Sequence, residues 1–231
     1  MKKFYKGIFV LAMILFLSSC SSGFKNINED GSFVLTKTGL EKNFTEKKNT
    51  KITWYTDTRC PDCTRAASNS EKYIKKSIKD GKVEVKYYPL ALLEKKSKYS
   101  LDGAVAILGV AEYEPEKIQE FLSLMEDDKG QDIKERNVAF IKENYQKAEI
   151  SEDAQNKIKS NKMKLENLVK HTTTLAKEKY KDDFFVPFIL VNDSGKPLDG
   201  ESENTEKDIV DPIQKAIKDL EKCGVSLECG H

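Results

Sequence analysis

The sequence has few residues of the kinds that hold metals or bind nucleic acids. Its 231 residues include 2 His and 1 Trp, and Arg occurs only at positions 59, 65 and 136. The 39 basic and 38 acidic residues nearly cancel, which leaves a formal net charge of +1. Because a polyanion is held by an excess of basic side chains, nucleic acid is not an expected partner.

The N-terminus lacks an apolar run long enough to span a membrane. Residues 7–17 are apolar and follow Lys at positions 2, 3 and 6, but they fall short of the roughly 20 residues that a spanning helix requires. A basic start followed by a short apolar run is typical of an export signal. We therefore expect residues 1–19 to be a signal peptide, with the rest of the chain outside the cytoplasm.

The end of this signal carries a modification motif. Leu17-Ser18-Ser19-Cys20 resembles the bacterial lipobox, in which cleavage leaves a lipid-modified Cys as the first mature residue. We expect a lipid on Cys20 to anchor the protein to the cell membrane without spanning it. The alternative is an ordinary signal peptide in which Cys20 is incidental.

Cysteine is scarce, and its spacing is informative. Of the 5 Cys residues, four remain once Cys20 is assigned to the lipid, and they form two close pairs, Cys60 with Cys63 and Cys223 with Cys229. Export places both pairs where disulfides persist. We expect residues 223–231 to be a tail closed by a structural disulfide, with a second redox pair as the alternative.

The first half of the chain predicts a strand, a helix and a further strand. Residues 20–32 are polar and small and predict a flexible tether. Residues 33–36 predict an edge strand, and the β-branched and aromatic run at 52–56 predicts a buried one. The apolar spacing at 62–79 indicates a helix, and the alternation at 83–88 a strand, so the order is that of a βαβ unit.

The second half is predicted to be mainly helical. Helices are expected at 101–113, 115–125, near 131–144 and at 152–181, followed by a hairpin of strands 185–191 and 196–198 and a last helix at 205–222. Thr205 and Asp208 resemble a capping box at the start of that last helix. Pro212 indicates either a kink or a later start.

The chemistry of the chain is concentrated at Arg59-Cys60-Pro61-Asp62-Cys63. An exposed Cys60 at a helix start would face unpaired N–H groups, which favour the thiolate that attacks disulfides. Cys63, one turn later, could then resolve the mixed disulfide. The pair could instead be a structural disulfide, or it could ligate zinc.

A zinc site usually needs four ligands, and only Cys223, Cys229, His171 and His231 could complete one. None of these forms a second compact ligand motif with its neighbours. His171 is expected to be a surface or packing residue, and His231 a terminal one. We therefore expect neither a metal nor an organic cofactor.

These features together resemble the thioredoxin fold, and more closely its DsbA-like branch, an α/β fold in which a βαβ half and a ββα half are separated by an inserted helical domain. The resemblance implies a thioredoxin-like domain at 33–99 and 182–222 and a helical domain at 100–181. It also implies that Pro187, in Val186-Pro187-Phe188, is a cis proline beside the cysteines. Val186 would then pair with a substrate peptide. A trans proline at a strand start is the alternative reading.

Two positions depart from the family pattern. Thioredoxin-like proteins often carry a buried acid six residues before the nucleophile, where this chain has Trp54, and the nearest acid, Asp57, is expected to be a turn residue. Asp62 opposes formation of the Cys60 thiolate, while Arg59 and Arg65 favour it. We therefore expect a nucleophile less acidic than in family members with Pro-His inside the motif.

The resemblance implies a thiol-disulfide oxidoreductase that acts on exported proteins and is recycled by a redox partner, with oxidation of clients as the favoured direction. A reductase for a dedicated substrate has the same fold. The non-catalytic alternative is a lipid-anchored binding protein or metal carrier. The sequence does not fix the direction, because direction depends on reduction potential and on the recycling partner.

Overall fold

The computed structural model describes residues 23–127, 132–194, 196–198 and 206–223. Its centre is a five-stranded mixed sheet with the order β2-β1-β4-β3-β5. Strands β3 and β4 are parallel, and the other neighbouring pairs are antiparallel. The strands are β1 (Phe33–Thr36), β2 (Gly39–Glu41), β3 (Thr50–Thr56), β4 (Val83–Pro89) and β5 (Phe188–Val191).

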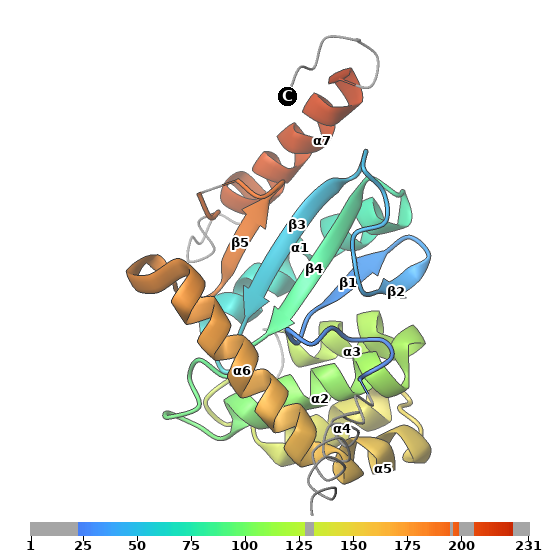
Figure 1. Cartoon of the computed structure of the whole chain (residues 1–231), viewed down its shortest axis with the longest axis vertical. Helices are drawn as coiled ribbons and strands as arrows, with labels where there is room; N and C mark the ends of the chain where they lie inside the picture. The colour runs from blue at the N-terminus through green and yellow to red at the C-terminus, as the bar shows by residue number, and fades with distance from the viewer. Residues whose placement is uncertain (1–22, 128–131, 195, 199–205, 224–231) are drawn as a thin grey trace, which may run out of the picture.

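The predicted βαβ unit is confirmed. Strand β3 pairs with β4 from Thr50 opposite Val83 to Thr56 opposite Pro89, and α1 (Pro61–Lys79) connects them behind the sheet (Figure 1). Six of the seven residues of β3 are buried, as its β-branched and aromatic composition predicts. The parallel register brings the carboxyl end of β3 to the start of α1, where the cysteine pair lies.

Helices occupy the described residues between β4 and β5. Helices α2 to α5 lie at one end of the sheet, and α7 (Asp211–Cys223) lies at the opposite end (Figure 1). Helix α2 is buried on all sides because nearly all its residues are apolar or small. The elements are α2 (Tyr99–Tyr113), η1 (Pro115–Lys117), α3 (Ile118–Met125), α4 (Val138–Lys147), α5 (Glu152–Ser160), α6 (Lys162–Tyr180) and η2 (Lys181–Asp183).

Three helix predictions need correction. The expected helix at 152–181 is two helices, because Asn161 ends α5 and its side-chain Nδ2 donates to the Lys157 carbonyl at 2.9 Å, in competition with the backbone. The helix expected near 131–144 begins only after Asn137, whose side chain caps the Ala139 N–H at 2.8 Å. Pro115 opens a short 3₁₀ turn before α3 rather than α3 itself.

Strand β1 is not an edge strand, because β2, which the sequence did not predict, pairs with it on the outer side. Of the hairpin predicted over 185–191 and 196–198, the described residues form strand β5 and one isolated β-bridge, between Ile189 and Leu198. At the C-terminal end, α7 follows a π-helical turn (Glu206–Val210), so Pro212 lies in its first turn, as the later start requires. Thr205 of the expected capping box lies outside the described residues.

The prediction of a flexible tether over residues 20–32 is wrong from Phe24 onward. The backbone N–H groups of Lys25, Asn26 and Ile27 donate to the Glu112 carboxylate at 2.7, 2.8 and 3.2 Å. Ile27 is 1% exposed. Because Glu112 lies near the end of α2, this segment is fastened to the helical region, a contact between residues too distant in sequence for local composition to reveal.

Candidate active site

The cysteine pair lies at the start of α1, shortly after the end of β3. Cys60 is the N-cap of α1 with an extended backbone, and its Sγ accepts the Cys63 N–H at 3.2 Å. Pro61 occupies the first turn, where a missing N–H costs no helical hydrogen bond. Cys60 Sγ also donates to the Val186 carbonyl oxygen at 3.3 Å. The sulfur of residue 60 therefore faces both the helix start and the loop before β5.

The two thiols have opposite electrostatic environments. The hydrogen bonds from the Cys63 side chain and backbone lower the pKa of Cys60, although burial and the charges of Asp62 and Asp57 act against this. Burial, followed by the hydrogen bond and charge of Cys60, raises the pKa of Cys63 well above its usual range. Both side chains are free thiols. The arrangement favours Cys60 as thiolate and Cys63 as neutral thiol.

Cys60 is less open than the sequence suggests, since it is only 5% exposed. Residues of the loop after β4 and of the segment that leads into β5 pack against it. The apolar residues that are buried with the cysteines are Tyr55, Leu90, Ala176, Val186, Phe188 and Leu190.

The loop before β5 provides the proline that the resemblance implies. The Val186–Pro187 peptide bond is cis. Val186 is buried and in the same cluster as the cysteines, and its carbonyl oxygen already accepts the Cys60 thiol. The strand expected to start at residue 185 begins three residues later, because β5 begins only at Phe188, after the proline.

Asp62 and Arg65 form an ion pair with each other, which limits their effect on the Cys60 sulfur. The two side chains form an ion pair across one helical turn, and each is about one-third exposed. The charge of Asp62 raises the pKa of Cys60, as expected, but the hydrogen bonds from Cys63 and the burial of the thiol affect that pKa more strongly. Because Arg65 is paired with Asp62, their effects on Cys60 partly cancel.

Asp57 does more than the turn role that the sequence predicts. Its Oδ1 does accept the Arg59 N–H at 2.8 Å, as a turn residue would. Its Oδ2, however, accepts the Leu93 N–H at 2.8 Å and the Ser100 hydroxyl at 2.6 Å. The side chain is 0% exposed, and burial raises its pKa despite these donors. Asp57 therefore fastens the cysteine turn to the helical region.

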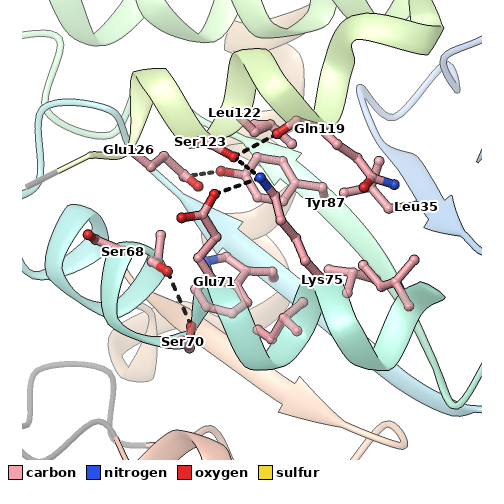
Figure 2. A pocket seen from close by; sticks show the side chains of 15 residues that line it. Leu35, Ser68, Ser70, Glu71, Lys75, Tyr87, Gln119, Leu122, Ser123 and Glu126 are labelled. Carbon is pink, nitrogen blue, oxygen red and sulfur yellow. Dashed lines mark hydrogen bonds and ion pairs between the residues drawn. The ribbon is translucent and has the colours of Figure 1, made fainter. Parts of the chain in front are cut away.

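A second buried acid, Glu126, was not identified from the sequence. It follows the last residue of α3, and its Oε1 accepts the Thr56 hydroxyl at 3.2 Å and the Tyr87 hydroxyl. Burial raises the pKa of Glu126 to about 7. The side chain lines a cavity of about 80 Å³ that opens to solvent between α1, α3 and the sheet (Figure 2). Trp54, at the position where the family often has its acid, lines the same cavity.

Several predicted residues contribute nothing to this site or lie beyond the described chain. Cys20, Cys229 and His231 lie outside the described residues, and Cys223 is the last residue of α7. His171 is exposed on α6. Within the described ranges, no group of three or more His, Cys, Asp or Glu side chains is placed to hold a metal ion. In the same ranges, no helix combines the length and hydropathy needed to cross a membrane.

Solved structures with the same fold belong to thiol-disulfide oxidoreductases. DsbA of Mycobacterium tuberculosis is 20% identical, with a TM-score of 0.62 over 84% of this chain and 98% of that one. BdbD of Bacillus subtilis is 20% identical, with a TM-score of 0.61 over 83% and 95%. MdbA of Corynebacterium diphtheriae, a thiol-disulfide oxidoreductase, is 19% identical, with a TM-score of 0.56 over 81% and 90%.

No curated protein matches the chain. The thioredoxin family model matches residues 45–218, which include β3, the cysteine pair, the helical region and most of α7. The helices between β4 and β5 agree with the insertion seen in DsbA-type structures. By this match, which covers well over half of its length, the chain belongs to the thioredoxin family.

Proposed function

We propose that this protein is an extracytoplasmic thiol-disulfide oxidoreductase that exchanges disulfides with exported proteins through Cys60 and Cys63. The observation that carries the proposal is the opposite shift of the two thiols, since the pKa of Cys60 is lowered and that of Cys63 is raised. A thiolate at neutral pH attacks disulfides, whereas its buried partner stays protonated until it is needed. Neither step requires an organic cofactor.

In the oxidising direction, a client thiolate attacks Sγ of Cys60 in the Cys60–Cys63 disulfide, and Cys63 leaves. A second client thiolate then attacks the client sulfur of the mixed disulfide, and Cys60 leaves as a thiolate. The environment that lowers the pKa of Cys60 stabilises this leaving group. For this reason we favour the oxidase direction, and a separate redox partner would reoxidise the pair.

The loop at Val186–Pro187 gives the client a place to bind. We propose that the client chain lies beside Val186 and exchanges backbone hydrogen bonds with it, which would bring a client sulfur to Cys60. Pro187 has no N–H to compete for the thiolate. Partly buried apolar side chains flank this position and would hold apolar client residues. They include Leu92, Leu93, Tyr180, Phe184 and Phe185.

Paired cysteine variants test the function. In Cys60→Ala, exchange with a model dithiol or disulfide peptide should vanish, whereas Cys63→Ala should accumulate mixed disulfides through Cys60 because the resolving thiol is missing. Isolation of the clients trapped by Cys63→Ala in cells would identify the substrates. Wild-type exchange that persists in Cys60→Ala would exclude the proposal. Loss of bound metal in either variant, without loss of exchange, would indicate a metal carrier.

The reductase alternative is favoured by one observation, the charges of Asp57 and Asp62 near the nucleophile. Both raise the pKa of Cys60 and so weaken the preference for its reduced form. Equilibration of the protein with glutathione separates the two directions. A reduction potential above that of glutathione supports the oxidase, and one below it supports the reductase.

We further propose that a lipid on Cys20 anchors the protein to the outer face of the cell membrane. The carbonyl oxygen of Phe24 accepts the Lys42 ammonium at 2.7 Å, and the Glu112 carboxylate holds the segment that follows. Only residues 21–23 separate Cys20 from Phe24, so the linker reaches at most roughly 14 Å. Mass spectrometry of the mature N-terminal peptide should find the lipid, and Cys20→Ser should release the protein from membranes.

A further inference from the structure

The cavity between α1, α3 and the sheet is separate from the cysteine site, because the residues that line it are all different from those buried with the cysteines. Its floor comes from three neighbouring strands. Trp54 of β3 is the register partner of Tyr87 of β4, and Val85 of β4 is the register partner of Leu35 of β1. The apolar side chains that α1 and α3 add to the walls are Ala67, Ile74, Ile78 and Leu122.

The polar side chains on the solvent side of the cavity have one another as partners. Lys75 pairs with Glu71 at 2.7 Å, and these side chains are 42% and 38% exposed. The Lys75 ammonium also donates to the Ser123 hydroxyl, which donates to the Gln119 carbonyl oxygen at 2.8 Å (Figure 2). Because these groups already bind one another, a ligand would gain few hydrogen bonds on this side.

Two buried groups in the lining have unused hydrogen-bonding capacity. Trp54 is 2% exposed, and its buried Nε1 has no hydrogen-bond partner among the residues that the structure describes. A buried N–H without an acceptor is costly, so nearly all such groups have one. Glu126 is 8% exposed, and within the described ranges its donors, Thr56 and Tyr87, both reach Oε1. The lining therefore offers a donor without an acceptor and a carboxylate with acceptor capacity to spare.

These two groups are neighbours in the fold. Trp54 lies opposite Tyr87 in the sheet, and the Tyr87 hydroxyl donates to Glu126. Thr56, the other donor to Glu126, follows Trp54 by two residues in β3, and alternate residues of a strand lie on the same face. Both residues that hold Glu126 are thus adjacent to Trp54. A single small polar group could therefore interact with the indole N–H and with the carboxylate together.

The chemistry of Trp54 and Glu126 selects the kind of ligand. An ammonium group has no lone pair to accept the indole N–H, and a carboxylate would be repelled by Glu126. A hydroxyl group has a donor and acceptor lone pairs, so its oxygen can accept from Trp54 while its O–H donates to Glu126. The aromatic floor and the apolar walls favour a ring as the rest of the ligand. An aromatic ring with one hydroxyl meets all these conditions.

The size of the cavity limits the ligand to a single ring. A closed apolar cavity of roughly 150 Å³ holds benzene, so a cavity of about 80 Å³ holds only part of such a ring. Because this cavity opens to solvent, the rest of the ring can remain in the opening. We propose that the cavity binds a small uncharged phenol, hydroxyl end first, with the hydroxyl between Trp54 and Glu126. This binding site goes beyond the proposed exchange of disulfides and does not depend on it.

The bound ligand would contact both parts of the fold. Helix α1 and the sheet belong to the thioredoxin-like part, whereas α3 belongs to the helical region between β4 and β5. A ligand that binds the folded state and not the unfolded one stabilises the folded state. Phenol should therefore raise the midpoint of thermal unfolding, and the rise should grow with the phenol concentration.

Calorimetric titration of the mature protein with phenol and with toluene tests the proposal. Phenol should bind with a Kd of about 1 mM or lower, and toluene about tenfold more weakly or less, because toluene has the ring without the hydroxyl. Trp54 is the single Trp of the chain, so phenol should also change the intrinsic Trp fluorescence and so report where it binds. Trp54→Phe keeps an aromatic ring but removes the N–H, and most of the preference for phenol should be lost.

A variant that fills the cavity locates the site. Ala67→Leu extends a larger side chain from α1 into the cavity and should abolish phenol binding. The matched control is Ala139→Leu, the same change at an exposed position of α4, which should bind phenol as the wild type does. If Ala67→Leu does not fold, the comparison of phenol with toluene in the wild type and in Trp54→Phe decides.

Three results would overturn the proposal. No binding of phenol by the wild type would mean that the cavity holds water only. Equal binding of phenol and toluene would mean that Trp54 and Glu126 do not recognise the hydroxyl. Unchanged phenol binding in folded Ala67→Leu would place the ligand elsewhere. Cys60→Ala should bind phenol as the wild type does, so the loss of exchange in that variant leaves this test unaffected.

Discussion

Asp57 and Glu126 are buried carboxyl groups on opposite sides of the boundary between the sheet and the helical region. Asp57 follows β3 and accepts hydrogen bonds from Leu93 and Ser100, at the start of the helical region. Glu126 follows α3 and accepts hydrogen bonds from Thr56 and Tyr87 in the sheet. Each region therefore supplies an acid that the other region binds, and the charge of Asp57 also acts on both cysteines.

The difference between them is the use of their oxygens. Both oxygens of Asp57 accept hydrogen bonds, whereas within the described ranges the donors to Glu126 both reach Oε1, and the side chain of Glu126 lines a cavity. A carboxylate whose lone pairs are all used holds structure together, and its removal leaves donors without partners. A carboxylate with a free oxygen and a pKa of about 7 can change its charge at little structural cost. The same chemical change should therefore have opposite effects at the two positions.

The largest change in the free energy of unfolding is expected for Asp57→Asn. The amide has the same shape but offers one acceptor oxygen, so its NH₂ group must face the donor of Arg59 or those of Leu93 and Ser100. Loss of a buried, charge-assisted hydrogen bond and a donor without a partner should lower the free energy of unfolding by about 4 kcal/mol. Urea denaturation followed by circular dichroism measures this value.

The control for that experiment is Asp62→Asn, which makes the same change on an exposed side chain within the cysteine motif. Its free energy of unfolding should stay within about 0.5 kcal/mol of the wild type. If Asp57→Asn were as stable as this control, the hydrogen bonds of Asp57 would not stabilise the contact between the two regions. Asp57 and Glu126 would then not differ in the way described above.

Glu126→Gln should instead stabilise the protein at high pH. The folded state keeps the proton of Glu126 up to a pKa of about 7, whereas the unfolded state releases it near the ordinary value of 4.5. Between these values the folded state binds more protons, so wild-type stability falls as pH rises. The fall amounts to roughly 3 kcal/mol and is complete above the folded pKa.

Gln carries no charge and still offers an oxygen to Tyr87 and Thr56, so the stability of the variant should not fall with pH in this way. Urea denaturation of the wild type and the variant at pH 4 and pH 8 isolates the contribution of Glu126 to stability, because every other ionisable group is present in both proteins. The variant should gain up to about 3 kcal/mol relative to the wild type between the two pH values. A constant difference at both pH values would show that the pKa of Glu126 is the same in the folded and the unfolded state.

The sequence predicted the cysteine pair and its βαβ frame because those signals are local. The alternating and helical patterns of β3, α1 and β4 lie within one contiguous stretch, and Cys60 and Cys63 are one turn apart. The turn role of Asp57 is local as well, since its Oδ1 accepts from Arg59. The family resemblance supplied Pro187, which no spacing alone would have assigned to the site.

The two carboxyl roles could not be predicted because their partners are distant in sequence. Glu126 is separated from Tyr87 by 39 residues and from Thr56 by 70, and Asp57 is separated from Ser100 by 43. Glu126 stands at the end of α3, next to a run of acidic residues that starts at Asp127, and nothing in this local sequence distinguishes a buried acid from an exposed one. Trp54 was recognised as a departure from the family pattern, but that departure did not indicate which other acids are buried.

The smallest effect is expected for Asp62→Asn on the acidity of Cys60, and it tests whether a third, exposed carboxylate matters beside the two buried ones. The charge of Asp62 raises the pKa of Cys60, but the side chain is partly exposed and paired with Arg65. Its removal should therefore lower the pKa of Cys60 only slightly. Titration of the ultraviolet thiolate absorbance measures this shift, with Asp80→Asn at the far end of α1 as the control without effect. A strongly acidic Cys60 in the wild type that is unchanged in Asp62→Asn would show that Asp62 does not restrain the nucleophile, and that the hydrogen bonds from Cys63 dominate its acidity.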